Sequence, residues 1–353
     1  MTQQATPGRF RQEVSDQGRA LRDLVSACQK HPGPLEEAAR LIGEMPDGAR
    51  LYFTGMGSSL FASYAACCRL WEHAVAATWC EAGELLHYQR PVIRSGDVVV
   101  MVSQSGETVE ICRLLDAFDA RVQIVGVTND PGSTLAKQAR VVLPMHAERE
   151  RMSTSKTYTN TLLLLRALAR RATSAEPWDL AARSLPDLVE QSIARWDTRA
   201  DELAVFFDST KMIDFIARGP AYATALQSSV ILKEGAHVVC EALSGATFRH
   251  GPIEAGGAGH GAVVFAPRGA GFDAAVTLAS DLVKLGSKTA VVTDDAGIDL
   301  PQGAFVEVVE PTDELLFAVL SAIPFELLIV SIARARGLEP GALTVGNKVT
   351  IRE

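Results

Sequence analysis

The chain has 353 residues, 47% of them hydrophobic and 22% charged, a composition typical of a globular protein with two domains rather than one. A net charge of −8 argues against a general surface for nucleic acid or for an anionic membrane, so we expect neither partner. The six cysteines form no C-x-x-C pair, and residues 1–9 lack the apolar core of a signal peptide. Both features are typical of a cytoplasmic protein with reduced thiols.

Short apolar runs alternate with amphipathic segments up to residue 172. The predicted helices cover residues 9–30, 35–45, 60–73, 84–89, 109–115, 133–139 and 157–172. The predicted strands cover residues 49–53, 77–80, 97–102, 122–127 and 141–143. Strands separated by helices indicate βαβ units and a parallel sheet, in which right-handed crossovers bring the strand ends to one edge.

The stretch 103–108, Ser-Gln-Ser-Gly-Glu-Thr, lies between a predicted strand and a predicted helix. The N–H groups and the positive end of the helix dipole suit a phosphate, and Ser103, Ser105 and Thr108 add hydroxyl donors. Gly106 allows a close approach of the backbone. The alternative is a simple N-cap made of Ser and Thr. A second small-residue turn, 54–59, follows the preceding strand but lacks the third glycine of a dinucleotide-binding loop.

A helical bridge over residues 173–210 separates this region from a second run of the same pattern. The predicted elements there are strands at 212–217, 262–266, 289–293 and 305–309, and helices at 221–234 and 314–335. The last helix is apolar enough to suggest a membrane span, but Pro324 and Glu326 favour a buried core helix. The turn 267–271, which matches 103–108 in position, has no Ser or Thr, so we expect one phosphate site per chain.

Six short motifs follow one another along the chain: 57–59 (Gly-Ser-Ser), 103–108, 153–156 (Ser-Thr-Ser-Lys), 232–234 (Leu-Lys-Glu), 249–252 (Arg-His-Gly-Pro) and 348–350 (Lys-Val-Thr). Together they resemble the double sugar-isomerase (SIS) domain family, notably the isomerase half of glucosamine-6-phosphate synthase and its stand-alone deaminase and deglycase relatives. The resemblance implies an α/β fold with two doubly wound, parallel-sheet, flavodoxin-like SIS domains in tandem. The expected parts are N-terminal helices 1–45, a first SIS domain 46–175, a linker 176–210, a second SIS domain 211–340 and a C-terminal tail 341–353 that completes the active site.

The resemblance also implies roles for individual residues. It implies that Ser103, Gln104, Ser105 and Thr108 bind the phosphate group. It also implies that Ser58, Ser59 and Thr154 bind the sugar. Glu234 matches the carboxylate that moves a proton between C1 and C2. His250 matches the ring-opening histidine donated by the neighbouring subunit of a homodimer, and Lys348 matches a lysine that contacts the open-chain sugar.

These residue types suit that chemistry. A shielded carboxylate with a raised pKa can move a proton next to a carbonyl, histidine titrates near neutrality, and lysine can polarise a carbonyl or form an imine. Simpler alternatives remain for each group. Lys233 and Glu234 could form a surface ion pair, His250 could satisfy a turn, and Lys348 could be a solvated tail residue.

The sequence departs from the synthase pattern at Ile231, where the synthase has a lysine, and at Thr344, where it has an arginine. No glutamine-hydrolysing domain is expected either. We therefore predict an enzyme, an aldose–ketose isomerase or deaminase of an amino-sugar 6-phosphate, similar to glucosamine-6-phosphate deaminase. The alternatives are a ketosamine-6-phosphate deglycase and a non-catalytic sugar-phosphate-binding regulator. No metal or organic cofactor is expected, because no His/Cys/Asp cluster has ligand spacing.

Overall fold

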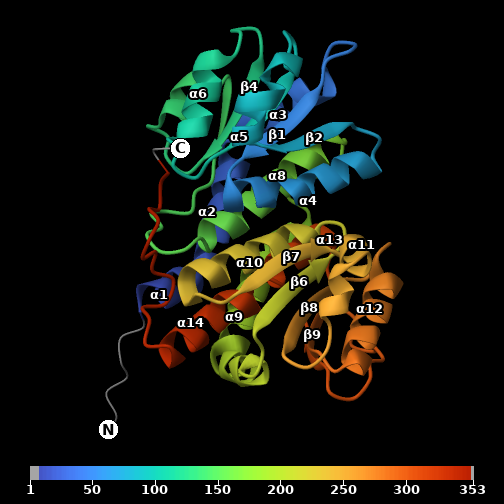
Figure 1. The fold of residues 1–353 in the computed structure, drawn as a ribbon. Helices are drawn as coiled ribbons and strands as arrows, with labels where there is room; N and C mark the ends of the chain where they lie inside the picture. Colours follow the sequence, from blue (N-terminus) through green and yellow to red (C-terminus); the bar gives the residue numbers. More distant parts are fainter. Residues whose placement is uncertain (1–7, 351–353) are drawn as a thin grey trace. The chain divides into compact units, whose positions relative to one another are not determined.

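The computed structural model describes residues 8–350, which fold into two compact units (Figure 1). The first-sheet unit contains residues 19–149, 157–186 and 349–350. The second-sheet unit contains residues 8–18, 150–156 and 187–348. The chain therefore enters the second-sheet unit three times, and the short segment 150–156 belongs to it although its neighbours on both sides do not.

The sheet of the first-sheet unit is parallel and has the strand order β2-β1-β3-β4-β5. Its strands are β1 (Leu51–Gly55), β2 (Ala77–Glu81), β3 (Val98–Val102), β4 (Gln123–Thr128) and β5 (Val141–Pro144). Its helices are α2 (Gln17–Lys30), α3 (Gly33–Gly43), α4 (Gly57–Glu72), α5 (Ala82–Glu84), η1 (Leu85–Gln89), η2 (Arg90–Val92), α6 (Val109–Ala117), α7 (Thr134–Gln138) and α8 (Lys156–Ala172).

The central strands β1 and β3 are buried along their whole length. Such strands read as continuous apolar runs because helices cover both faces of a parallel sheet. On one face, Val99 and Met101 belong to a core cluster with Ile111 and Leu114 of α6. The β-branched run 98–102 thus forms a strand whose two faces are both needed for the core.

The sheet of the second-sheet unit has the order β10-β9-β8-β6-β7 and is also parallel. Its strands are β6 (Met212–Ala217), β7 (Cys240–Ser244), β8 (His260–Ala266), β9 (Lys288–Thr293) and β10 (Phe305–Val308). Its helices are α1 (Arg9–Ser15), α9 (Leu180–Phe207), α10 (Ala221–Ala236), α11 (Gly245–Arg249), η3 (Pro252–Ala255), α12 (Phe272–Leu285), α13 (Glu314–Leu320) and α14 (Ile323–Ala335).

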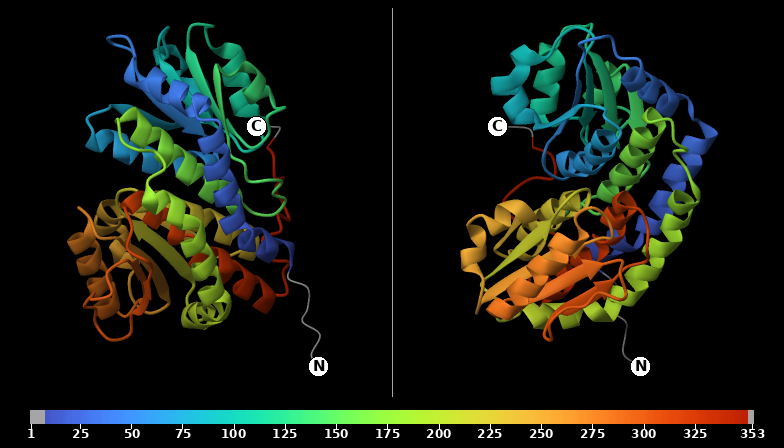
Figure 2. Two further views of the ribbon diagram at one scale, coloured as in Figure 1. Left: turned by 180° about the vertical axis from the view of Figure 1, so that it is seen from behind. Right: turned by 90° about the vertical axis from the view of Figure 1, so that its right-hand side faces the viewer.

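Helices cover both faces of this second sheet as well (Figure 2). Ile216 and Val264 face α12, where they share a core cluster with Leu278. Their neighbours Phe215 and Phe265 point to the opposite face, since successive strand residues alternate. There both rings make edge-on contacts with Phe325 of α14, at centroid distances of 5.1 and 5.5 Å.

The fold class predicted from the sequence is confirmed. Counted from the first strand of each unit, both sheets have the order 2-1-3-4-5 of a flavodoxin-like doubly wound fold. The second half therefore repeats the first. None of the six cysteines, all of which lie in the described part of the chain, forms a disulfide.

Two predicted helices are interrupted in the structure. The helix expected over 9–30 breaks at Asp16, and next to this break the side-chain amide of Gln17 donates to the carbonyl of Val14 at 3.2 Å. The helix expected over 314–335 breaks after Leu320, and Pro324 lies in the first turn of α14, where its missing N–H costs no hydrogen bond. This apolar stretch is long enough to span a membrane, but 89% of its most apolar window is buried inside the structure.

Candidate active site

The hydroxyl-rich loop lies at the topological switch point of the first sheet. β1 and β3 are neighbours, with Gly55 opposite Val102, and the chain leaves both strands there. Residues 103–108 follow β3, while Ser58 and Ser59 lie in the first turn of α4 after β1. An open α/β sheet binds its ligands in the crevice at this point. The first-sheet unit thus brings together the residues predicted to bind phosphate and two of those predicted to bind sugar.

The loop is held by its own hydroxyl groups. The Ser103 and Thr108 hydroxyl oxygens are 3.0 Å apart, and Ser103 Oγ accepts a hydrogen bond of 3.1 Å from the Gly106 backbone N–H. Ser105 Oγ accepts from the backbone N–H of Glu107 at 3.2 Å. Gly106 has a φ of +64°, and a Cβ there would lie 2.1 Å from Ser133 Oγ, so the turn requires glycine.

The acidic side chain of this loop is directed to another helix. Glu107 accepts hydrogen bonds from the backbone N–H of Thr134, at 2.6 Å, and from its hydroxyl, at 2.9 Å. A carboxylate at the start of α7 is stabilised by the dipole of that helix. Glu107 therefore interacts with the start of α7. At the start of α6, the first N–H, that of Val109, donates to the carbonyl of Thr350 at 3.2 Å.

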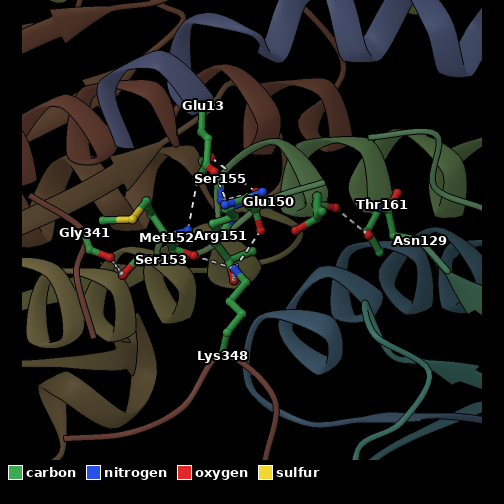
Figure 3. A network of polar contacts seen from close by, with 12 residues as sticks. Glu13, Asn129, Glu150, Arg151, Met152, Ser153, Ser155, Thr161, Gly341 and Lys348 are labelled. Atoms are coloured by element: carbon green, nitrogen blue, oxygen red, sulfur yellow. Dashed lines mark hydrogen bonds and ion pairs between the residues drawn. The ribbon is translucent and has the colours of Figure 1, made fainter. Parts of the chain in front are cut away.

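A second group of candidate residues surrounds the ammonium of Lys348 in the second-sheet unit (Figure 3). Lys348 Nζ donates to Glu150 Oε2 at 2.8 Å, to the carbonyl of Met152 at 2.6 Å and to Thr154 Oγ1 at 3.3 Å. The Glu150 side chain is fully buried, whereas 22% of the Lys348 side chain is exposed. Lys348 is therefore an anchored residue rather than a freely solvated tail residue, and its exposed part is available to a ligand.

Glu234 interacts with the same group. It lies near the C-terminal end of α10 and is partly buried. Burial raises the pKa of the Glu234 carboxyl, while the positive charge of Lys348 and a hydrogen bond from Ser153 lower it and leave a net increase. The backbone N–H of Ser153 donates to the carbonyl of Gly341 at 2.8 Å, and this carbonyl, 3.1 Å from Ser153 Oγ, competes with Glu234 for the single hydroxyl proton. A carboxylate with a raised pKa beside a fixed cation is a typical general base.

Sequence reasoning missed Glu150 and Glu13, which shape this site. Glu13 of α1 is buried, and its two carboxylate oxygens accept from the backbone N–H groups of Arg151 and Met152 at 2.8 and 3.1 Å (Figure 3). Glu150 also accepts from the N–H and the hydroxyl of Ser155. These bonds hold segment 150–156 in the form that presents acceptors to Lys348. The pairing of Glu13 with residues 138 positions away leaves no local sequence signal.

His250 lies apart from this group within the described residues. It follows α11 directly, and its side chain is exposed. Neither Glu234 nor Lys348 is joined to it by a contact in the described part of the chain. The donation of His250 across a dimer interface stays a prediction.

The two departures from the synthase pattern have different surroundings. Ile231 is fully buried in α10 and contributes to the core. Thr344 is exposed, and its hydroxyl lies 3.4 Å from His237 Nε2. Residue 344 therefore connects the C-terminal segment to the end of α10.

A Ser–His–Asp series elsewhere in this unit is structural. His260 Nδ1 lies 3.0 Å from Ser287 Oγ, and His260 Nε2 lies 3.0 Å from Asp214 Oδ2. All three side chains are buried, and Ser287 Oγ already accepts from the N–H of Gly257. A nucleophile must reach its substrate, so this series stabilises the strands rather than acting as a triad. Across residues 8–350, no cluster of three His, Cys, Asp or Glu side chains suits a metal ion.

The switch point of the second sheet is built differently. It lies between β6 and β8, beside Gly219 and the turn 267–271. A Cβ at Gly269 would lie 1.9 Å from Glu314 Oε1, and one at Gly219 would lie 3.0 Å from Glu314 Oε2. The carboxylate of Glu314 therefore lies against the turn that corresponds to the hydroxyl loop of the first sheet.

Comparison with known proteins gives consistent results. The SIS domain family model matches residues 45–171 and 206–335. Glutamine–fructose-6-phosphate aminotransferase (isomerizing) from Pyrococcus horikoshii is 26% identical over 336 residues, which cover 93% of this chain and 55% of the relative. The chain thus spans about half the length of this curated relative.

Two solved structures are similar over nearly the whole chain. The C-terminal domain of glucosamine-fructose-6-phosphate aminotransferase from Francisella tularensis has a TM-score of 0.84 at 19% identity, covering 97% of this chain and 99% of that one. Glucosamine-6-phosphate deaminase from Thermotoga maritima has a TM-score of 0.78 at 20% identity, with the same two coverages. At these identities the likeness shows a shared fold.

Proposed function

We propose, since the chain belongs to the SIS-domain family, that it is an isomerase or deaminase of an amino-sugar 6-phosphate. The observation that carries this proposal is the partly buried carboxylate of Glu234, which interacts electrostatically with the ammonium of Lys348, itself held by Glu150. The hydroxyl loop 103–108 supplies the expected site for the phosphate group. Ser58, Ser59 and Thr154 are proposed to contact the sugar.

The proposed reaction is a proton shift followed by hydrolysis. In open-chain glucosamine 6-phosphate, C1 is an aldehyde and C2 carries the amine. Glu234 takes the proton from C2 and returns it to C1, while one proton of the amine passes to the carbonyl oxygen, which leaves a hydroxyl on C1 and an imine at C2. Water adds to the imine and ammonia leaves, so that glucosamine 6-phosphate and water give fructose 6-phosphate and ammonia. Burial raises the pKa of the Glu234 carboxyl, which makes its carboxylate a stronger base for the C2 proton.

Lys348 is proposed to stabilise the negative charge that develops on the carbonyl oxygen. Its ammonium has three N–H groups and three acceptors in the structure. The contact with Thr154 Oγ1, at 3.3 Å, is the longest, so a substrate oxygen would replace it at the lowest cost. The charged contact with Glu150 would keep the ammonium in place during this exchange.

His250 is proposed to open the sugar ring from the neighbouring chain of a homodimer, in a cytoplasmic enzyme. Mixing Glu234→Gln and His250→Asn variants, each inactive alone, tests this arrangement. A mixed dimer would contain one site with both native groups, so activity should return after the subunits exchange. If the two groups acted from the same chain, every site in the mixture would stay defective and no activity would return.

The direct test of function incubates the folded protein with glucosamine 6-phosphate and with galactosamine 6-phosphate, and follows ammonia and ketose phosphate. Release of both products from either substrate supports a deaminase. An isomerase would instead convert a 2-hydroxy aldose phosphate, such as glucose 6-phosphate, into the ketose phosphate, a reaction that releases no ammonia. Release of a free amine from a phosphorylated ketosamine would instead support a deglycase. Phosphosugar binding with no exchange of the C2 proton in deuterated water would indicate a regulator and contradict the proposed enzyme.

A further inference from the structure

A cavity of about 320 Å³ lies in the second-sheet unit, at the edge where β6 and β7 begin. This edge is opposite to the carboxyl ends of the strands, and hence to the switch point of that sheet. The walls come from the ends of α9 and α14, the start of β6 and the approach to β7. The volume is at the lower end of the range for small-molecule sites in proteins.

The walls of this cavity are largely apolar and reach the surface. Val205 and Val239 line it, and they are 75% and 68% exposed. Phe207, Ile213 and Ile332 extend the apolar lining. Exposed large aliphatic side chains that converge on a hollow are the usual mark of a binding site rather than of ordinary surface.

Two positively charged side chains, Lys211 and Arg336, line the cavity, against a single acidic residue, Asp208. Among the described residues, no carboxylate lies within ion-pair distance of Lys211. Arg336 uses Nη1 to donate to the carbonyls of Ala236 and His237, at 2.9 and 2.7 Å. In a chain with a net charge of −8, this is a local excess of positive charge that complements an anion.

We propose that this cavity is a second ligand site, for a small organic anion with an apolar body. The apolar walls would take the body of the ligand, and Lys211 would pair with its anionic group. The site is distinct from the hydroxyl loop, which belongs to the other unit and carries no apolar walls of this kind.

The cavity is connected to the candidate catalytic groups through His237. This residue ends α10 three positions after Glu234, and its Nε2 lies 3.4 Å from the hydroxyl of Thr344, four positions before Lys348. A ligand that contacts His237 therefore touches both the end of the Glu234 helix and the segment that carries Lys348. If Glu234 and Lys348 act as proposed, a ligand in this cavity would be an effector of the enzyme, so this inference rests on the proposed function. Binding to the cavity can be measured without any turnover.

A matched pair of fluorescent probes tests the site: 1-anilinonaphthalene-8-sulfonate and its uncharged parent, N-phenyl-1-naphthylamine. The sulfonate should bind to the native full chain with one saturable site, and Lys211→Glu should weaken it by about tenfold. The uncharged probe should be unaffected by that variant, whereas Val239→Trp, which fills the cavity, should weaken both probes. Lys284→Glu and Leu285→Trp, on exposed positions of α12 outside the cavity, are the controls.

Hydrogen exchange gives the second readout. Sulfonate binding should slow exchange in residues 341–348 of the native chain and should fail to do so in Lys211→Glu at the same probe concentration. The proposal is overturned if the sulfonate does not bind, if it binds equally well to all variants, or if Lys211→Glu weakens both probes alike. A concentration-dependent dimerisation that Val239→Trp abolishes without any probe effect would show instead that a second copy of the chain covers the cavity. None of these results depends on turnover, so a failure here leaves the proposed enzyme untouched.

Discussion

The two switch points of this molecule share a topology but differ in chemistry. Beside β1 and β3, a loop with three hydroxyl side chains follows the strand, and Gly106 allows it to turn against Ser133. Beside β6 and β8, the matching turn has no hydroxyl side chain, and the carboxylate of Glu314 lies against Gly219 and Gly269. The Arg218 side chain lies beside the same turn, 3.3 Å from a Cβ placed at Gly271, so this edge has charged groups of both signs where the first sheet has hydroxyl donors.

The difference shows how two units with the same fold can have different roles. The backbone supplies the same edge twice, because strand order and crossover handedness are the same in both units. The side chains decide which edge binds an anion. The second-sheet unit has lost that feature, yet it contains Glu234, Thr154 and Lys348. We therefore expect binding effects from changes in the first unit and effects on the chemical step from changes in the second.

The largest effect is expected from Glu234→Gln, which keeps the size of the side chain but removes the base. Turnover should fall by about a thousandfold or more, because no group would accept the C2 proton. Binding of a sugar phosphate should change little, since the proposed phosphate-binding residues belong to the other unit. Steady-state kinetics and equilibrium binding measure the two quantities, and Glu202→Gln, an exposed glutamate on α9, is the control. Equal losses of turnover and binding would show that Glu234 is structural.

The next largest effect is expected in the hydroxyl loop. Ser103→Ala removes a donor to a charged phosphate and should raise KM by about ten- to a hundredfold with a smaller change in kcat. The same variant tests the number of sites. With one site per chain, the whole binding isotherm should shift, whereas a second working switch point would leave half of the binding at native affinity. Ser184→Ala, on α9, is the matched control.

The sequence was sufficient to predict the fold and the location of the hydroxyl loop, because both depend on local patterns. Apolar β-branched runs such as 98–102 mark buried strands, and a Ser/Thr/Gly turn after such a run marks a strand-to-helix junction. The interruption at Asp16 was not predictable in the same way. Next to it lies the buried side chain of Gln17, which contacts Glu326, more than three hundred positions away.

The surroundings of Lys348 were also beyond sequence patterns. The resemblance singled out the lysine, but its anchoring by Glu150 and the support of that segment by Glu13 depend on residues distant in the chain. The same holds for Glu314, which begins a helix in the sequence and lies against the turn 267–271 in the structure. Long-range polar contacts of this kind depend on how the elements pack, and no pattern of residue spacing in the sequence predicts them.

An identical substitution in the two crevices gives a direct comparison of their rigidity. Gly106→Ala should lower the free energy of unfolding by about 1–3 kcal/mol, because φ is +64° and a Cβ would lie 2.5 Å from the Cβ of Ser133. Gly269→Ala should also destabilise the fold, because φ is +159°, but by less, because the nearest atoms belong to the flexible end of Glu314, which can move away. Denaturant unfolding of both variants measures the difference. Equal costs would contradict the contrast between a fixed turn and an adjustable one.

The smallest expected effect concerns the acid limb of the pH profile. The hydrogen bond from Ser153 lowers the pKa of Glu234, which burial raises, so Ser153→Ala should raise that pKa further. Because the base acts when deprotonated, kcat falls as the pH drops through this pKa, and the variant should lose activity at a higher pH than the native enzyme. We expect a shift of less than about one pH unit. The pH profile of kcat at saturating substrate measures this shift, because kcat reports the ionisation of groups in the enzyme–substrate complex and not that of the phosphate group of the free substrate. Ser331→Ala on α14 is the control, and a shift to lower pH in Ser153→Ala would show that Ser153 does not stabilise the charged form of Glu234.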